Sequence, residues 1–401
     1  MELFINPFRP GAGQPPPYLA GREHEKNEFE KLFHQQPILK NAILTGLRGV
    51  GKTVLLESLK PIALKNGWFW AGNDLSEAAS VSEQSLSIRI IADLSPLVSS
   101  FTIADEERKI IGFLSPGDKH EIKLNFQVLM AIYNMTAGLE SDKLKKVLEV
   151  VWDAVKPKVK GIVLAYDEAQ ILKDKAADKQ YPLSLLLEVI QYLQKKQIPY
   201  LLMLTGLPTL FPNLVEARTY AERMFDVTTL DRLSEAESTQ AIMIPIIDKE
   251  CPVSFTDHGI KEILKFSCGY PYFIQFFCKE VFDSILQQIQ VGIQAPDVSI
   301  PEIVSKLDTD FYSGRWSRVT DRQRELLSII AKLSNADEEF TVKDISEKSI
   351  QLNNQFKPTY VNNSLLKLID AGLIYKNRRS KYSFAVPLLA DYIIRQDLNK
   401  S

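Results

Sequence analysis

Gly46-Leu47-Arg48-Gly49-Val50-Gly51-Lys52-Thr53 is the stretch that decides the fold. It fits the pattern G-x-x-x-x-G-K-[ST], a P-loop, in which glycines let backbone N–H groups face phosphates. Lys52 would neutralise phosphate charge and the Thr53 hydroxyl could ligate Mg²⁺. An apolar strand precedes the loop, and a helix whose N-terminus favours anions follows it. We therefore predict a nucleoside triphosphate site, with its phosphates near Gly46, Gly49, Val50, Gly51, Lys52, Thr53 and Val54.

A second motif follows the apolar run of residues 161–166, which ends in Asp167-Glu168. A buried parallel strand has this composition, and its carboxyl end is where ligands bind in open α/β sheets. Asp167 is expected to hold the Mg²⁺ water shell, and Glu168 to orient or deprotonate the attacking water. Alone, the acidic pair fits a solvated strand end better; behind a P-loop the Walker B interpretation is favoured.

A third apolar strand, residues 198–205, ends in Thr205. A polar residue at that tip can position the lytic water or sense the γ-phosphate, although the spacing equally fits a plain strand-ending threonine. Strands and helices alternate from the P-loop to this point, which predicts an α/β fold with a parallel sheet and helices on both faces.

The composition is that of an ordinary soluble protein: 401 residues, 45% hydrophobic, 24% charged and a net charge of −2. The three cysteines lack C-x-x-C spacing, so neither a disulfide framework nor a zinc site is expected. No run is long and apolar enough for a membrane span, and the first residues lack the order of a signal peptide. We expect a cytoplasmic protein.

Composition shifts divide the chain into four parts. We expect an extended Pro-rich lead-in at 1–18, a P-loop domain at 19–233 with a helical insertion at about 76–156, a helical lid at 234–312 and a C-terminal domain at 313–401. Ser234 and Glu237 form a capping box that begins the lid. The polar stretch 102–119 fits a surface insertion without a special role better than an oligomer contact.

The C-terminal part combines three predicted helices, 322–333, 340–348 and 359–371, with a basic hairpin of residues 373–384. This order is typical of a winged helix-turn-helix, which binds DNA through its third helix and its wing. The DNA-contact candidates are Thr359, Tyr360, Asn362, Asn363, Lys367, Lys376, Arg378, Arg379 and Lys381. Winged helices also dock proteins, and a basic hairpin is often merely solvated, so both alternatives stay open.

The whole pattern resembles the AAA+ and STAND-type P-loop ATPases, nearest to archaeal origin-recognition proteins and related bacterial ATPases. The resemblance covers about residues 6–398 and rests on the two Walker motifs and Thr205 together with three further segments. These segments are Leu19-Ala20-Gly21-Arg22-Glu23, Tyr220-Ala221-Glu222-Arg223-Met224-Phe225 and Gly269-Tyr270-Pro271. It implies an ASCE/AAA+ ATPase domain, a helical lid, and ATP with Mg²⁺ as cofactors.

The resemblance also implies roles for individual residues. Tyr18, Leu19, Gly21 and Arg22 would border the adenine, Pro271 would belong to the lid, and Thr205 would act as sensor 1. Arg223, with Arg218 and Arg232 as alternatives, would be an arginine finger that reaches the γ-phosphate of a neighbouring subunit in an ATP-state homo-oligomer.

Two function classes follow from the resemblance. One is a DNA-associated AAA+ factor of the replication, transposition or defence type. The other is a STAND-like switch whose winged helix binds a protein partner. Residues 269–275 carry no basic side chain where AAA+ initiators usually have a sensor-2 arginine, which favours slow, switch-like hydrolysis.

Overall fold

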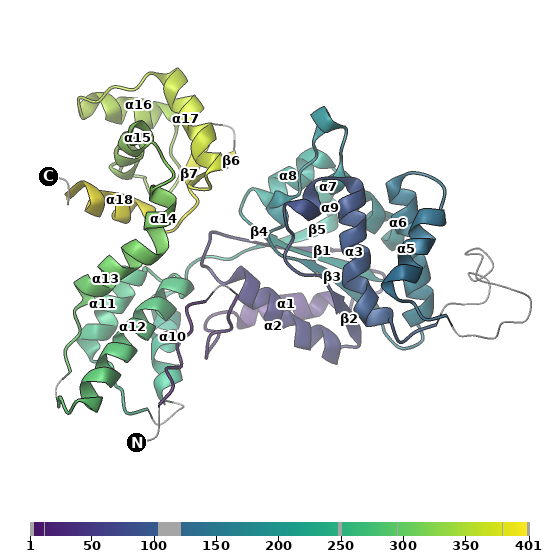
Figure 1. The fold of residues 1–401 in the computed structure, drawn as a ribbon, viewed down its shortest axis with the longest axis horizontal. Coiled ribbons are helices and arrows are strands. Elements are labelled where there is room, and N and C mark those ends of the chain that lie inside the picture. The colour runs from purple at the N-terminus through teal and green to yellow at the C-terminus, as the bar shows by residue number, and fades with distance from the viewer. Residues whose placement is uncertain are drawn as a thin grey trace, which may run out of the picture. The chain divides into compact units, whose positions relative to one another are not determined.

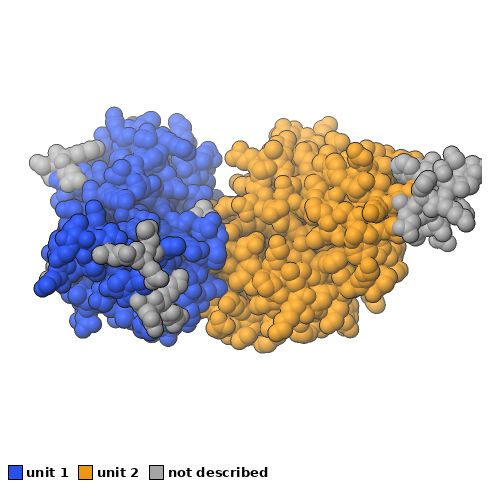
Figure 2. Space-filling model, turned by 60° about the horizontal axis from the view of Figure 1, so that its bottom comes forward, with its two compact units in different colours: residues 1–21, 47–51, 230–401 blue, residues 22–46, 52–229 orange. Residues whose placement is uncertain are grey.

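The computed structural model describes residues 4–11, 13–102, 122–247, 251–294, 296–378 and 380–398. Two compact units make up the chain (Figure 2). We call residues 22–46 and 52–229 the sheet unit, and residues 1–21, 47–51 and 230–401 the helical unit. Most of the predicted 102–119 insertion lies outside the described residues, as do Arg379 and the side chain of Arg378. The predicted boundary at residue 312 stays a prediction, because both of its flanks belong to the helical unit.

The sheet unit is a five-stranded parallel sheet covered by helices (Figure 1). Its helices α1 and α2 lie on one face, and α3 and α7 on the other (Figure 1). The elements are α1 (Glu23–Leu32), β1 (Asn41–Thr45), α2 (Lys52–Lys65), β2 (Trp68–Ala71), α3 (Glu83–Val98), α5 (Phe126–Met135), α6 (Glu140–Val155), β3 (Gly161–Tyr166), α7 (Pro182–Lys195), β4 (Tyr200–Gly206), α8 (Leu210–Ala217), α9 (Ala221–Met224) and β5 (Phe225–Thr229). The predicted α/β fold is confirmed.

The strand order is β2-β3-β4-β1-β5, so β4 lies between β1 and β3 although it follows both in the chain. Leu44 of β1 pairs with Thr205 of β4, and Tyr166 of β3 pairs with Leu204. Because all strands are parallel, the carboxyl ends of β1, β4 and β3 meet at one edge of the sheet. Within the sheet unit, this order brings Gly46, where the P-loop starts, Thr205 and Asp167 to the same edge of the sheet.

The helical insertion packs into the same core as the sheet. Leu144, Val147, Leu148, Val151 and Val155 form an apolar stripe on α6 and are buried with residues of α3, α5, β3 and α7, while Trp152 of the same helix is half-buried against this core. The spacing of these residues is that of a helix with one face toward the core.

A buried asparagine holds the centre of the sheet together. Asn41, at the start of β1, is fully buried, and its Oδ1 accepts bonds from Leu202 N (2.9 Å) and Gln194 Nε2 (2.8 Å). Its Nδ2 donates to Met224 O (3.2 Å). One amide therefore connects β1 with β4, with α7 and with the chain that enters β5.

The helical unit contains the predicted lid and C-terminal elements. These are α10 (Glu235–Ile247), α11 (Asp257–Ser267), α12 (Pro271–Gln290), α13 (Ile300–Leu307), a π-helical turn (Asp308–Tyr312), α14 (Ser313–Trp316), α15 (Asp321–Ala331), α16 (Val342–Gln351), α17 (Pro358–Asp370), β6 (Ile374–Arg378), β7 (Lys381–Phe384) and α18 (Leu389–Leu398). The predicted capping box is present: Ser234 N donates to Glu237 Oε2 (2.8 Å), and Glu237 N donates to Ser234 Oγ (3.3 Å).

One predicted boundary in this unit is wrong. Phe340 does not begin a helix; it exchanges backbone hydrogen bonds with Tyr382 of β7 in an antiparallel bridge. Helix α16 instead begins at Val342, because Thr341 and Asp344 form a capping box there. Pairing with a strand forty residues away leaves no local signal in the sequence.

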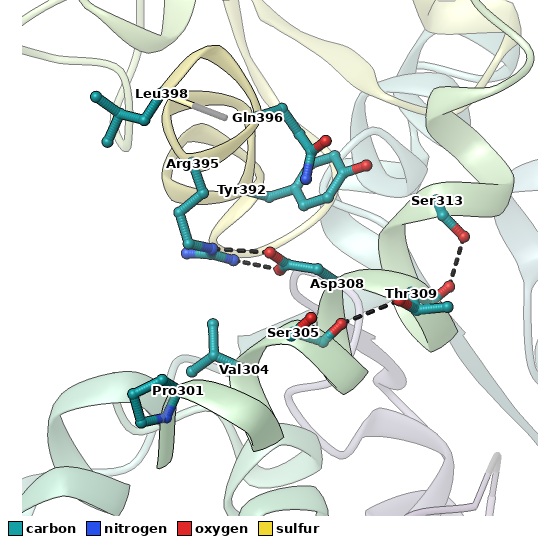
Figure 3. Close-up of a pocket in the computed structure, with 10 residues that line it drawn as sticks. All are labelled: Pro301, Val304, Ser305, Asp308, Thr309, Ser313, Tyr392, Arg395, Gln396 and Leu398. Carbon is teal, nitrogen blue, oxygen red and sulfur yellow. Dashed lines mark hydrogen bonds and ion pairs between the residues drawn. The ribbon is translucent and has the colours of Figure 1, made fainter. Parts of the chain in front are cut away.

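An ion pair ties the C-terminal helix to the middle of the unit. Arg395 of α18 reaches Asp308, with Nε 2.9 Å from Oδ2 and a second bond from its NH2 group (Figure 3). Beside it the Tyr312 hydroxyl donates to Pro387 O (2.9 Å), and the Tyr312 and Tyr392 rings stack at 4.8 Å. The groove that surrounds Asp308 and Arg395 has a volume of about 500 Å³, and its two charges already neutralise each other.

Replacing Asn41 by alanine should lower the free energy of unfolding by about 2–3 kcal/mol, because the substitution leaves buried backbone groups without hydrogen-bond partners. Urea unfolding at neutral pH measures this. The matched control is Asn66→Ala, since the half-buried Asn66 bonds only to Ile62 O and Glu30 near a helix end. Equal losses in the two variants would contradict a central role for Asn41.

Candidate nucleotide-binding site

The P-loop follows β1 directly, and its glycines have the backbone that the motif requires. Gly49 (φ 78°) and Gly51 (φ 92°) adopt left-handed conformations that L side chains rarely take. Helix α2 then begins at Lys52. Lys52 is only 8% exposed, and its ammonium donates to Gly46 O at 3.0 Å.

Asp167 is the centre of the site. It follows β3, its side chain is buried, and its two carboxylate oxygens accept hydrogen bonds from two hydroxyls. Thr53 of α2 donates to Oδ2, and the fully buried Thr205 of β4 donates to Oδ1. The backbone N–H of Glu168 also donates to Oδ1 (2.7 Å). The structure thus brings together the residues predicted from three separate motifs.

Glu168 differs from Asp167 in both backbone and exposure. Its φ of 52° places a non-glycine residue in the left-handed region, and its side chain is exposed. Such strain is held only where the surrounding structure fixes it, and it is common at functional sites. The bonds of the 3₁₀ turn Ala169–Ile171, among them Ile171 N to Glu168 O (3.1 Å), hold this conformation.

Asp74 was not among the residues predicted from the sequence. It lies beyond β2, forms a parallel bridge with Asp167, and the following Leu75 N donates to Asp167 O (3.1 Å). Burial raises the pKa of Asp74, the charges of Asp167 and Glu168 raise this pKa further, and Arg89 opposes them. Three carboxyl groups therefore gather at this edge of the sheet. An acidic residue three positions after a strand was the available signal, but only the strand pairing identifies its neighbours.

The magnesium candidates fit a metal bound together with a nucleotide. Among the residues that the structure describes, no group of three or more His, Cys, Asp or Glu side chains is placed to hold a metal ion. Mg²⁺ is commonly held by one or two protein oxygens together with substrate phosphates and water. Thr53 and Asp167, which hydrogen-bond to each other, provide such a pair.

The adenine candidates lie in different parts of the chain. In the helical unit, Tyr18 packs on the core and Gly21 has a φ of 62°. A methyl group on Gly21 would lie 2.5 Å from the Glu237 carboxylate, and the positive φ disfavours any other residue there. Leu19 is half-buried and Pro271 is the first residue of α12. In the sheet unit, Arg22 is 6% exposed and pairs with Glu25 (3.3 Å), and Val54 lies on α2.

The arginine-finger candidates are all exposed. Arg223 lies on the short helix α9, and no acidic residue pairs with it in the part of the chain that the structure describes; the nearby Asp226 pairs with Lys40 instead (3.6 Å). Arg218 interacts with Tyr220 and opposes the burial that raises the pKa of that phenol. Arg232 N donates to Asp231 Oδ1 (2.7 Å) in the helical unit.

The DNA candidates lie on α17 and on the β6–β7 hairpin. Thr359, Tyr360, Asn362, Asn363 and Lys367 of α17 are exposed, as is Lys376 of β6, whereas Lys381 of β7 is half-buried. The Tyr360 ring stacks on Phe356 at 5.4 Å, and the Arg322 guanidinium lies 4.0 Å from the Phe356 ring centre. Arg322 was not among the predicted candidates because it lies on a different helix.

Several known structures are similar to this chain in fold. The Walker-type ATPase PABY2304 of Pyrococcus abyssi is 16% identical, with a TM-score of 0.60 over 94% of this chain and 96% of its own. The Aeropyrum pernix ORC2 protein in its ADP form is 13% identical, with a TM-score of 0.56 over 97% of both chains. Its ADPNP–ADP complexes give 12% identity and a TM-score of 0.53 over 97% of this chain and 98% of theirs. The chain therefore has the fold of AAA+ P-loop ATPases of the origin-recognition type, as the resemblance predicts.

Sequence comparisons add one match. A family model described as a domain of unknown function (DUF8462) matches residues 309–393. No curated protein matches the sequence. Within the described ranges, no helix has the length and apolar character needed to cross a membrane.

The raised pKa of Asp74 gives a pH-dependent test. Its charged form is disfavoured in the folded state, so the carboxyl stabilises the fold below the ordinary aspartate pKa and loses this contribution as the pH rises through its folded pKa. Asp74→Asn should therefore increase the free energy of unfolding at pH 7, modestly because the side chain is exposed, and leave it unchanged near pH 3. Urea unfolding at both pH values measures this difference.

The matched control for this test is Asp153→Asn. Asp153 is exposed on α6 and pairs with Lys156 at 2.7 Å, so its removal should bring no gain at pH 7. A loss of stability at pH 7 in Asp74→Asn would show that Asp74 is held by favourable contacts instead of being crowded by the other two carboxylates.

Proposed function

We propose that this protein binds and hydrolyses ATP as an AAA+ ATPase and acts as a DNA-associated, nucleotide-dependent oligomer of the replication, transposition or defence type. The observation that carries the ATPase part is the pair of hydroxyl bonds on Asp167, from Thr53 behind the P-loop and from Thr205 at the end of β4. A carboxylate bonded to the threonine of the P-loop motif and to a threonine at the end of β4 supports metal and sensor roles for these groups.

The donors present fit ATP with Mg²⁺. Lys52 supplies the positive charge that a polyphosphate requires, and α2 begins at that residue, so a helix N-terminus faces the same anions. Thr53 and Asp167 supply the oxygens that would hold Mg²⁺, which when bound neutralises phosphate charge. Glu168 is the exposed carboxylate beside them and would accept a proton from the attacking water. The ORC2 structure with ADPNP and ADP supports the assignment by analogy of fold.

Assembly through Arg223 would complete this site. The side chain is exposed on α9 and has no acidic partner among the described residues, so its charge is available to a neighbouring subunit. An arginine supplied in trans stabilises the charge that develops on the phosphoryl group and is worth roughly 10³–10⁵ in rate.

The DNA role is supported by the surface of the C-terminal elements. Helix α17 presents Asn362, Asn363 and Lys367, and Lys376 extends the basic character onto β6. Asparagine amides can bind adenine edges, and lysines bind phosphates without regard to sequence. Tyr360, which is exposed near the start of α17, stacks on the buried Phe356, and the Arg322 guanidinium lies against the same Phe356 ring.

The second candidate is a STAND-like switch that binds a protein partner, and two observations favour it. In the helical unit, Tyr272 N of the lid donates to Gly49 O at 3.2 Å, so the lid holds the P-loop backbone without any basic residue in 269–275. The same C-terminal elements also expose Ile350, Leu352 and Leu366, which are better suited to a protein surface than to DNA.

ATP hydrolysis with and without double-stranded DNA separates the two candidates. Wild type should turn over ATP faster with DNA. Glu168→Gln and Arg223→Ala should each lose at least about 100-fold in kcat while still binding ATP, because each removes a group needed only for hydrolysis. An ATP hydrolysis rate that is the same with and without DNA, together with nucleotide-dependent capture of a protein, would favour the switch. Wild type that fails to bind ATP would overturn both candidates.

Charge reversal on the hairpin tests the DNA contact directly. Lys376→Glu with Lys381→Glu should weaken duplex binding by about tenfold or more and lower the slope of log affinity against log salt by about one to two. Fluorescence anisotropy over a range of salt concentrations measures both quantities. Lys60→Glu with Lys156→Glu, two exposed charges of the sheet unit, is the control. Equal effects of both pairs would show that only net charge matters.

A further inference from the structure

Gln170 makes two hydrogen bonds that none of the motifs explains. It lies in the 3₁₀ turn Ala169–Ile171, two residues after Glu168, and its side chain is half-buried. Its Nε2 donates to Glu168 Oε2 at 2.5 Å. Its Oε1 accepts from the backbone N–H of Leu207 at 3.0 Å. The amide therefore bridges the carboxylate after β3 and the backbone just beyond β4.

Glu168 depends on this bridge for its orientation. Its side chain is exposed, so packing does not fix its rotamer. Among the described residues, Gln170 is the one side chain that donates a hydrogen bond to the Glu168 carboxylate, and no basic residue pairs with it. The bond uses Oε2 and leaves Oε1 without a protein partner in the described chain.

The residue type suits this task. A neutral amide can donate to a carboxylate and accept from a backbone N–H at the same time. A lysine or arginine in its place could hold Glu168, but it would neutralise the charge that attracts a proton, and it could not accept from Leu207. A carboxylate in its place could accept from Leu207 but would repel Glu168.

The space around Gly206 supports the bridge. A methyl group on Gly206 would lie 2.5 Å from Gln170 Oε1, closer than any real contact, and 3.3 Å from the backbone N of Gln170. Gly206 is the last residue of β4 and follows Thr205, whose hydroxyl donates to Asp167. The end of β4 is therefore linked to the Asp167-Glu168 pair twice, through Thr205 and through Gln170.

We propose that Gln170 is a positioning residue that couples Glu168 to the carboxyl end of β4, so that a displacement of Thr205-Gly206-Leu207 is passed on to the Glu168 carboxylate. The proposal rests on the function proposed above, in which Glu168 activates water and Thr205 senses the phosphoryl group. A change at Thr205 would then reach Glu168 by two routes: through Asp167, whose backbone precedes it, and through the amide that holds its side chain.

Two substitutions separate the two hydrogen bonds. Gln170→Glu keeps the acceptor for Leu207 and loses the donor to Glu168, whereas Gln170→Met has a similar length and loses both. We expect both to lower kcat for ATP by about tenfold with KM within about twofold, because Glu168 is misplaced while ATP binding is retained. In the nucleotide-free protein, exchange of the Leu207 amide hydrogen should accelerate about tenfold in Gln170→Met and stay unchanged in Gln170→Glu.

Gly206→Ala tests the bridge without altering either partner. Its methyl group should displace the Gln170 amide, and the variant should therefore behave as Gln170→Met does, with a lower kcat and faster exchange of the Leu207 amide. Gly314→Ala is the matched glycine control, because a methyl group there meets no atom within 4 Å. Gln127→Ala is the matched glutamine control, since that residue is exposed on α5. Both controls should retain wild-type kcat and exchange.

The outcomes distinguish this proposal from the function on which it rests. If wild type does not hydrolyse ATP, the proposed function fails, and the exchange measurements alone decide whether Gln170 holds Leu207. If wild type hydrolyses ATP and Gln170→Glu keeps kcat within twofold, coupling to Glu168 is overturned while the ATPase stands. If exchange of the Leu207 amide hydrogen is unchanged in both Gln170→Met and Gly206→Ala, the hydrogen bond between Gln170 and Leu207 is overturned as well.

Discussion

Everything at the candidate site depends on one buried carboxylate. Asp167 is 3% exposed, and a charge at such depth is tolerated only where hydrogen bonds replace water. Thr53, Thr205 and the Glu168 backbone supply those bonds from three segments of the chain. Because each donor is costly to leave unpaired as well, the segments hold one another in register. The position of β4 between β1 and β3 is the structural condition for all three contacts.

The sequence predicted the local parts of this arrangement well. The P-loop, the strand ending at Asp167 and the strand ending at Thr205 each leave a pattern within ten residues, and so does the capping box at Ser234. Strand order leaves no such pattern, so the hydrogen bond between Thr205 and Asp167 could not be foreseen. Asp74 and Gln170 were missed for the same reason, since their neighbours are set by pairing and turn geometry. Roles that need a second subunit or DNA, such as that of Arg223, stay predictions.

A series of aromatic ring contacts connects the lid with the C-terminal helix α18 inside the helical unit. Tyr272 contacts Phe311 (5.1 Å between ring centres), Phe311 contacts Tyr312 (4.9 Å) and Tyr312 stacks on Tyr392 of α18 (4.8 Å). Packed rings resist gradual deformation and exchange between discrete arrangements instead. Tyr272 N also donates to Gly49 O of the P-loop within this unit. The packed rings therefore connect the P-loop backbone with α18.

The left-handed backbone of Glu168 has a consequence for stability. A side chain held at a φ of 52° costs about 1–3 kcal/mol that a glycine there would not incur. The same substitution would delete the carboxylate. A glycine at position 168 would therefore relax the backbone and remove the exposed carboxylate beside Asp167 in one change. The backbone conformation thus favours glycine at the position where the proposed hydrolysis needs a carboxylate.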